Sequence, residues 1–254
     1  MPFQNYNRPL HKAISHRGFY SKGKVDEIVR IADQSDYETC LDLQNNVVNT
    51  EDDYTSSMLT RIRDKICKSS TLNMGVTITS KRLPPSEERK LGTDGIFIFK
   101  NNKRGYAVLC LFEAKWPRLE KPKTVSWDSF QNKNVPARKM SHFHSQLLRQ
   151  EPYAAKVMVW EMFYGYETKE NYMKKNQSAC MQFGELKGHI AARNKLDLWT
   201  TSELKLLLHK PSLTIGEILR KALYVVTQPM SIDDAESFAK DYGPVSNFCV
   251  VEEY

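Results

Sequence analysis

The stretch over residues 92–115, GTDGIFIFKNNKRGYAVLCLFEAK, is the part of the sequence that most constrains the fold. Two apolar runs rich in β-branched and aromatic residues flank the turn signal NNKRG, a pattern that predicts a β-hairpin. A hairpin that turns there pairs Lys100 with Ala107 and therefore Asp94 with Glu113. Directly opposed residues of an antiparallel pair lie on the same face of the sheet, about 5 Å apart. The hairpin is thus predicted to bring two carboxylates together at one end of the sheet.

A lysine is expected beside these two acids. Because side chains alternate between the two faces of a strand, Lys115 shares the face of Glu113, whereas Ala114 points the other way. Two carboxylates this close repel each other unless a cation or a proton lies between them, so the pattern favours a divalent metal site. The alternative is that the charges only mark strand ends that emerge into water, with a Glu113–Lys115 ion pair that contributes less than about 1 kcal/mol. The strongly apolar strand before the acids favours the metal site.

A helix predicted over residues 50–70 provides a third acid. Thr50 is a good N-cap with Asp53 three positions on, and an apolar residue recurs at every fourth position from Tyr54 onward. Glu51 precedes Tyr54 by three residues and prolongs that apolar stripe. We therefore expect Glu51 to point toward the core. The simpler interpretation is an acid that interacts favourably with the helix dipole.

The elements around the hairpin predict an α/β protein. Helices and strands alternate there, so we expect a mixed sheet flanked by helices. Capping signals in the tail predict helices after Ser202, Thr214 and Ser231, and VSNFCVVEEY is expected to form a final strand. Before the tail, helices are expected over residues 25–34, 50–70 and 138–150, and an apolar-spaced segment over 37–48. A strand is expected over 73–83, a buried strand over 154–164, and a connector over 165–200.

This layout resembles the PD-(D/E)xK nuclease superfamily, whose restriction-endonuclease-like core has the order α-β-β-β-α-β. Thr93-Asp94 stands for the PD motif, with threonine in place of the usual proline, and Glu113-Ala114-Lys115 stands for ExK. The first-helix acid of that family would be Glu51. We therefore expect a basic and helical segment over residues 1–49, a nuclease core over 50–164, and a mainly helical C-terminal extension over 165–254 packed on the core.

The resemblance also implies a reaction, the hydrolysis of phosphodiester bonds with Mg²⁺ as the cofactor, for which Mn²⁺ can substitute. Asp94 and Glu113 would hold the metal together with the backbone carbonyl of Ala114, since Mg²⁺ prefers oxygen ligands. Lys115 would position or help to deprotonate the attacking water and stabilise the developing charge. Glu51 would complete the metal site or orient a metal-bound water.

The distribution of charge points to a polyanionic partner. The formal net charge is +7, and residues 1–24 and 131–150 contain basic side chains and no acid. Either stretch alone is most simply a solvated face, but together they favour nucleic acid. Helical spacing places His142, Gln146 and Arg149 of the second stretch on one face. The resemblance implies that a glutamine at this place holds the active site or the substrate. The residues expected to contact DNA are Arg138, Lys139, His142, Gln146 and Arg149.

Composition limits the remaining classes. With 254 residues, of which 41% are hydrophobic, the chain suits one large globular domain or a core with an added lobe. No apolar run is long enough to cross a membrane and no signal segment is visible, so we expect a cytoplasmic protein with no membrane partner. The five cysteines have no metal-ligand spacing and are expected to be reduced.

The sequence therefore predicts a metal-dependent nuclease that cleaves DNA in antiviral defence, restriction or repair, with RNA left open as a substrate. The alternative is a catalytically inactive nuclease-like fold that binds nucleic acid or a partner protein. Two acids that repel each other have no physical use in a retired site, which counts against this alternative. The tail leaves open a homodimer or a larger protein complex.

Overall fold

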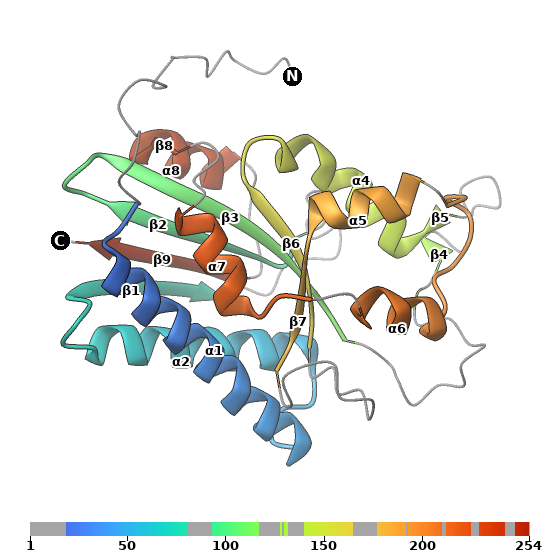
Figure 1. The fold of residues 1–254 in the computed structure, drawn as a ribbon, viewed down its shortest axis with the longest axis horizontal. Coiled ribbons are helices and arrows are strands. Elements are labelled where there is room, and N and C mark those ends of the chain that lie inside the picture. Colours follow the sequence, from blue (N-terminus) through green and yellow to red (C-terminus); the bar gives the residue numbers. More distant parts are fainter. Residues whose placement is uncertain are drawn as a thin grey trace.

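The computed structural model describes residues 19–80, 93–116, 128, 130–131, 140–164, 177–191, 193–209, 212–224, 229–241 and 247–253. In these ranges seven strands form one mixed sheet in the order β1-β9-β2-β3-β6-β7, with β8 paired to β3, and helices cover both faces (Figure 1). The expected class, an α/β protein with a mixed sheet flanked by helices, is therefore confirmed.

The strands of this sheet are β1 (Met74–Ser80), β2 (Gly95–Asn101), β3 (Tyr106–Lys115), β6 (Met158–Phe163), β7 (Ala179–Gln182), β8 (Met230–Ser231) and β9 (Asn247–Glu253). A separate pair is formed by β4 (Phe130–Gln131) and β5 (Met140–Ser141). The helices are α1 (Lys22–Gln44), α2 (Glu51–Lys68), α4 (His142–Ala154), α5 (Phe183–Ala191), α6 (Thr201–His209), α7 (Ile215–Tyr224) and α8 (Ile232–Asp241). None of the helices in the described ranges is both long enough and apolar enough to cross a membrane.

The hairpin of β2 and β3 has the predicted register. Lys100 lies opposite Ala107 and Gly95 lies opposite Phe112. Gly95 is required by packing, because a Cβ at this position would lie 2.2 Å from the Phe112 ring. The pair that follows in this register is Asp94 with Glu113, so the sheet brings the two acids to the same end, as the sequence predicts.

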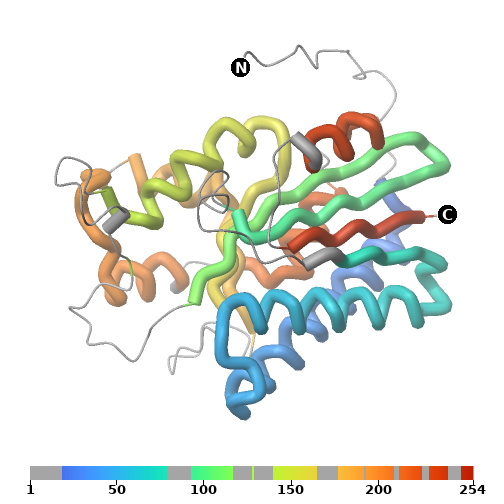
Figure 2. Tube along the Cα trace, turned by 180° about the vertical axis from the view of Figure 1, so that it is seen from behind, coloured from blue at the N-terminus to red at the C-terminus, as the bar shows by residue number. Residues whose placement is uncertain are grey.

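The last described strand lies inside the sheet, next to the edge strand β1. β9 pairs in parallel with β2 and antiparallel with β1, and Figure 2 shows it between these two strands. β1 and β2 are therefore not neighbours. β7, β8 and β9 all lie beyond residue 164, so the part of the chain expected to be a helical extension contributes to the central sheet itself. The sequence predicts this strand but not its neighbours in the sheet, since the pairing joins residues far apart in the chain.

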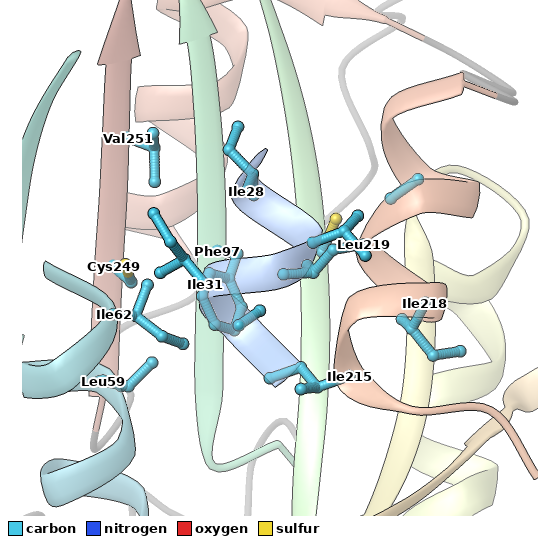
Figure 3. Packing of buried hydrophobic residues seen from close by; sticks show 14 of the residues in the cluster. Ile28, Ile31, Leu59, Ile62, Phe97, Ile215, Ile218, Leu219, Cys249 and Val251 are labelled. Atoms are coloured by element: carbon cyan, nitrogen blue, oxygen red, sulfur yellow. The ribbon is translucent and has the colours of Figure 1, made fainter. Parts of the chain in front are cut away.

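Each face of the sheet carries its own apolar core. Phe97 and Phe99 of β2 pack with α1, α2 and α7 on one face, where Figure 3 shows Ile28, Ile62 and Leu219 around Phe97. The alternating residues of the same hairpin face the other way and pack with α4, α5, α6 and α8. Those residues are Ile96, Ile98, Leu109 and Leu111. The strand alternation continues to Asp94, Glu113 and Lys115, which therefore belong to the α4 face.

Several boundaries differ from the expectations. The segments expected over 25–34 and 37–48 form one continuous helix, α1, because no glycine or proline interrupts its buried stripe. α4 begins at His142 rather than at 138, since the Ser141 hydroxyl caps it by accepting the His144 N–H at 3.0 Å. β6 begins at Met158 because the residues from 154 on complete α4 and its turn.

The tail helices also show where capping signals succeed and fail. Thr214 caps α7 and exchanges two hydrogen bonds with Glu217, as expected from their spacing. For α6, however, the cap is Thr200, whose hydroxyl accepts the Glu203 N–H at 3.2 Å, and Ser202 lies inside the helix. The expected connector over 165–200 contains β7 and α5.

Candidate active site

Asp94 lies just before β2, beside the end of β3. Its Oδ2 accepts the backbone N–H of Ala114 at 2.6 Å, and its own backbone N–H donates to the Phe112 carbonyl at 2.9 Å. The Asp94 carbonyl accepts the N–H of Asn247, the first residue of β9, at 3.0 Å. Two neighbouring strands thus fix the backbone on which this carboxylate is held.

Glu113 and Lys115 lie at the end of β3 and are largely shielded from solvent. Their side chains are 5% and 11% exposed, and Lys115 Nζ lies 2.6 Å from Glu113 Oε1. Gln146 of α4 donates its Nε2 hydrogen to the same Glu113 oxygen. One carboxylate oxygen therefore receives two donors, which is more than an exposed ion pair at a strand end would gather.

Glu51 reaches the same place from the N-terminus of α2. The Thr50 hydroxyl accepts the Asp53 N–H at 3.1 Å, so the helix begins as predicted and Glu51 is its first residue. Burial raises the pKa of Glu51 to about 7, while Lys115 nearby lowers it and Glu113 raises it. A main-chain hydrogen bond with Trp116 also lowers this pKa. Glu51 thus adjoins the end of β3, where the apolar stripe of its helix pointed.

Another buried acid, outside the group just described, holds α2 in place. Asp36 of α1 accepts the Tyr54 hydroxyl at 2.8 Å, and it accepts both the backbone N–H and the hydroxyl of Ser178 at 2.6 Å. The Tyr54 ring stacks on Tyr164, with ring centroids 4.1 Å apart. We call Asp36, Tyr54 and Ser178 the Asp36 cluster. It joins α1, α2 and the start of β7, and so holds α2 in the position that presents Glu51.

A fifth charged residue, Glu161 of β6, was not identified from the sequence. β3 and β6 run in parallel, with Glu113 opposite Glu161. Glu161 is fully buried, and its Oε1 accepts Gln150 Nε2 at 2.7 Å. The signal in the sequence is a single acid inside the apolar run VMVWEMFY. Since this strand was expected to be buried, the acid could have been singled out for that reason alone.

The site holds more acids than one lysine can balance. We call Glu51, Asp94, Glu113, Lys115 and Glu161 the carboxylate cluster. Burial, followed by repulsion from Glu113 and Glu51, raises the pKa of Asp94 well above its usual range. Burial also raises the pKa of Glu161 to about 8, whereas Lys115 lowers it. Burial alone would lower the pKa of Lys115, but the surrounding acids raise it above its usual range.

The donor chemistry of this cluster suits a hard divalent cation. Asp94 and Glu113 offer carboxylate oxygens at adjacent strand ends, and the excess negative charge is the kind that Mg²⁺ or Mn²⁺ neutralises. Within the described ranges, no set of three or more His, Cys, Asp or Glu side chains is already arranged around a metal position. Lys115 Nζ lies 2.6 Å from one Glu113 oxygen and supplies positive charge to the cluster. The residues fit the group in type and charge.

Of the five residues expected to bind nucleic acid, the structure describes the three that lie on α4. Gln146 lies in the site through its bond to Glu113, and the pKa of His142 is lowered by burial and by nearby Lys115. Arg149 Nη1 donates to Ser145 of the same helix at 2.9 Å. The expected contacts from Arg138 and Lys139 fall outside the described residues.

No protein-family model, no curated protein and no solved structure matches this chain significantly. The order of α2, β1, β2, β3, α4 and β6 along the chain agrees with the α-β-β-β-α-β order, but β9 separates β1 from β2.

Proposed function

We propose that this protein is a metal-dependent nuclease of the PD-(D/E)xK type that hydrolyses phosphodiester bonds of DNA, in antiviral defence, restriction or repair. The observation that carries the proposal is the meeting of Asp94, Glu113 and Lys115 where β2 begins and β3 ends, on the face covered by α4. Glu51 joins them from a different element.

The proposed cofactor is Mg²⁺, with Mn²⁺ as a substitute, held by Asp94, Glu113 and the backbone carbonyl of Ala114. When bound, it would polarise the phosphate and lower the pKa of a water molecule. The protein would supply the rest. Lys115 would hold the attacking water and stabilise charge that develops on the phosphate oxygens. Gln146 would keep Glu113 in a single orientation through the hydrogen bond that it already donates.

We assign substrate binding to α4 and to two basic residues that precede it in the sequence. His142 and Gln146 lie at the cluster, and Arg149 is on the same helix. Arg138 and Lys139 are proposed as phosphate contacts that hold the nucleic acid without reading its sequence. Such contacts make binding fall steeply as salt rises.

A cleavage assay with DNA and RNA substrates, with and without Mg²⁺ or Mn²⁺, tests the proposal. We expect cleavage of DNA that needs the cation and stops when a chelator is added, because the paired acids have no catalytic use without it. The matched control is Asp52→Asn, which removes an exposed acid next to Glu51 and is expected to leave cleavage intact. Full cleavage in excess chelator would rule out the metal mechanism.

One observation favours a second candidate, a nuclease-like fold that binds nucleic acid or a protein without cutting. The Lys115 ammonium balances the charge of Glu113 without any metal, as expected in a site that has lost its catalytic function. Calorimetric titration with Mn²⁺ separates the two candidates. The nuclease must bind Mn²⁺ through Asp94 and Glu113, whereas the binding module is expected to retain nucleic-acid binding without it.

A further inference from the structure

Lys115 lies between two acids that are very differently satisfied. Its Nζ is 2.6 Å from Glu113 Oε1 and 4.0 Å from Glu161 Oε2. The Glu113 oxygen receives a second donor from Gln146. The Glu161 oxygen is buried and has no hydrogen-bond partner. The lysine therefore contacts one acid. A short movement would bring it into contact with the second acid, whose nearer oxygen has no donor.

The unpartnered oxygen of Glu161 calls for an explanation, because a buried carboxylate oxygen without a donor is costly. Apolar side chains would fill this part of β6 at no such cost, as replacements of buried charges in other proteins show. Gln150 holds the other oxygen of the same carboxylate at 2.7 Å. One oxygen is thus fixed by α4, and the other faces the lysine and remains available for a donor that arrives.

We propose that Glu161 is a positioning residue for Lys115, the second counter-charge toward which the ammonium moves when Glu113 binds a cation. The inference rests on the proposed function, because it assumes that a divalent cation uses Glu113. A divalent cation on Glu113 would neutralise this carboxylate and repel the Lys115 ammonium, which lies 2.6 Å from Glu113 Oε1. Without Glu161, the displaced ammonium would be left buried and unpaired, which is strongly unfavourable. Glu161 therefore favours cation binding while keeping the lysine beside the site.

A double-mutant cycle on Mn²⁺ affinity tests this without any cleavage. The full-length protein, Glu161→Gln, Lys115→Met and the double variant are titrated with Mn²⁺ by calorimetry. Glu161→Gln keeps the size of the side chain and its bond to Gln150, but it cannot become negatively charged when the ammonium approaches. We expect it to weaken Mn²⁺ binding about tenfold, as coupled neighbours do. In the Lys115→Met background, where no ammonium has to move, the same change should have a much smaller effect.

The outcomes separate this inference from the proposed function. An equal loss of affinity in both backgrounds, or no loss in either, overturns the role of Glu161 and leaves the metal site standing. A parent protein that binds no Mn²⁺ overturns both.

A second measurement uses the unaltered protein and does not depend on how the variants fold. In a crystal structure of the wild-type protein with Mn²⁺ bound, Lys115 Nζ should move from 4.0 Å to hydrogen-bond distance of Glu161 Oε2, about 2.7–2.9 Å. Its contact with Glu113 should be lost. Lys115 that remains on Glu113 beside the bound cation overturns the inference.

Discussion

The Asp36 cluster and the carboxylate cluster are both built on buried acids, but they are satisfied in opposite ways. Every side-chain oxygen of Asp36 accepts a donor, from Tyr54 or from Ser178. In the carboxylate cluster, one lysine serves several acids, and a Glu161 oxygen has no donor. A buried acid that serves the fold gathers donors until each of its oxygens accepts a hydrogen bond. An acid with too few donors indicates that something else is meant to bind there.

The largest expected effect that tests this contrast is on catalysis. Lys115→Ala should lower the DNA cleavage rate by about 10²–10⁴-fold, the usual contribution of a group that handles a proton or a developing charge. Because the buried Glu113 loses its ammonium, the melting temperature should also fall, so cleavage is compared well below the melting temperature of the variant. Lys65→Ala is the matched control, because it removes another lysine–acid pair, with Glu38, far from the proposed chemistry. Wild-type cleavage by Lys115→Ala would show that the motif is wrongly assigned.

The second prediction compares two aspartates. Asp36→Ala leaves the buried Ser178 N–H without its partner, so it should lower the free energy of unfolding by about 1–3 kcal/mol. Asp94→Ala loses one acceptor but also relieves repulsion from Glu113 and Glu51, so the metal-free protein should lose less stability or none. Chemical denaturation of both variants measures this. Activity should show the reverse order, and equal losses of stability would remove the distinction between the clusters.

The third prediction concerns pH. Burial raises the pKa of Glu161 to about 8 and that of Asp36 to about 6, so the folded protein binds protons that the unfolded chain releases from about pH 4. The metal-free protein should therefore lose stability as pH rises from about 4 to 8, by at most about 1.4 kcal/mol per pH unit for each acid. Glu161→Gln should flatten the part of this curve between pH 6 and 8. Thermal denaturation in chelator measures it, and a stability that rises with pH in this range contradicts the assignment.

The smallest expected effect separates Glu51 from its neighbour. Glu51→Gln keeps size and hydrogen bonding but drops the charge, so it should weaken Mn²⁺ affinity or turnover several-fold. Asp52→Asn should change only the stability of the helix, by a few tenths to about 1 kcal/mol. Calorimetry and denaturation on both variants provide the comparison. If both variants bind Mn²⁺ and cleave DNA like the parent protein, the only role left for Glu51 is its favourable interaction with the helix dipole.

The sequence predicted the parts of the site that depend on local pattern. The register of the hairpin follows from its turn, and strand alternation then places Asp94, Glu113 and Lys115 on one face. Glu51 follows in the same way from helical spacing. These rules act over a few residues, so a single chain is enough to apply them.

What the sequence could not show depends on pairing across long distances. Glu161 lies beside Glu113 only because β6 pairs in parallel with β3 after the crossover through α4, and nothing local determines that register. The insertion of β9 between β1 and β2 likewise joins segments separated by more than a hundred residues. The continuity of α1 was missed for a different reason, because polar Ser35 and Asp36 interrupt its apolar pattern although both are buried.

The position of β9 inside the sheet bears on when a newly made chain can acquire its site. Before residues 247–253 are synthesised, β1 and β2 have no partner between them and present open edges to other chains. Asn247 also donates a hydrogen bond to the backbone carbonyl of Asp94, so β3 alone holds the proposed metal ligand until β9 has arrived. For a protein proposed to cut DNA, the order of synthesis would keep the nascent polypeptide inactive on the ribosome until β9 has emerged.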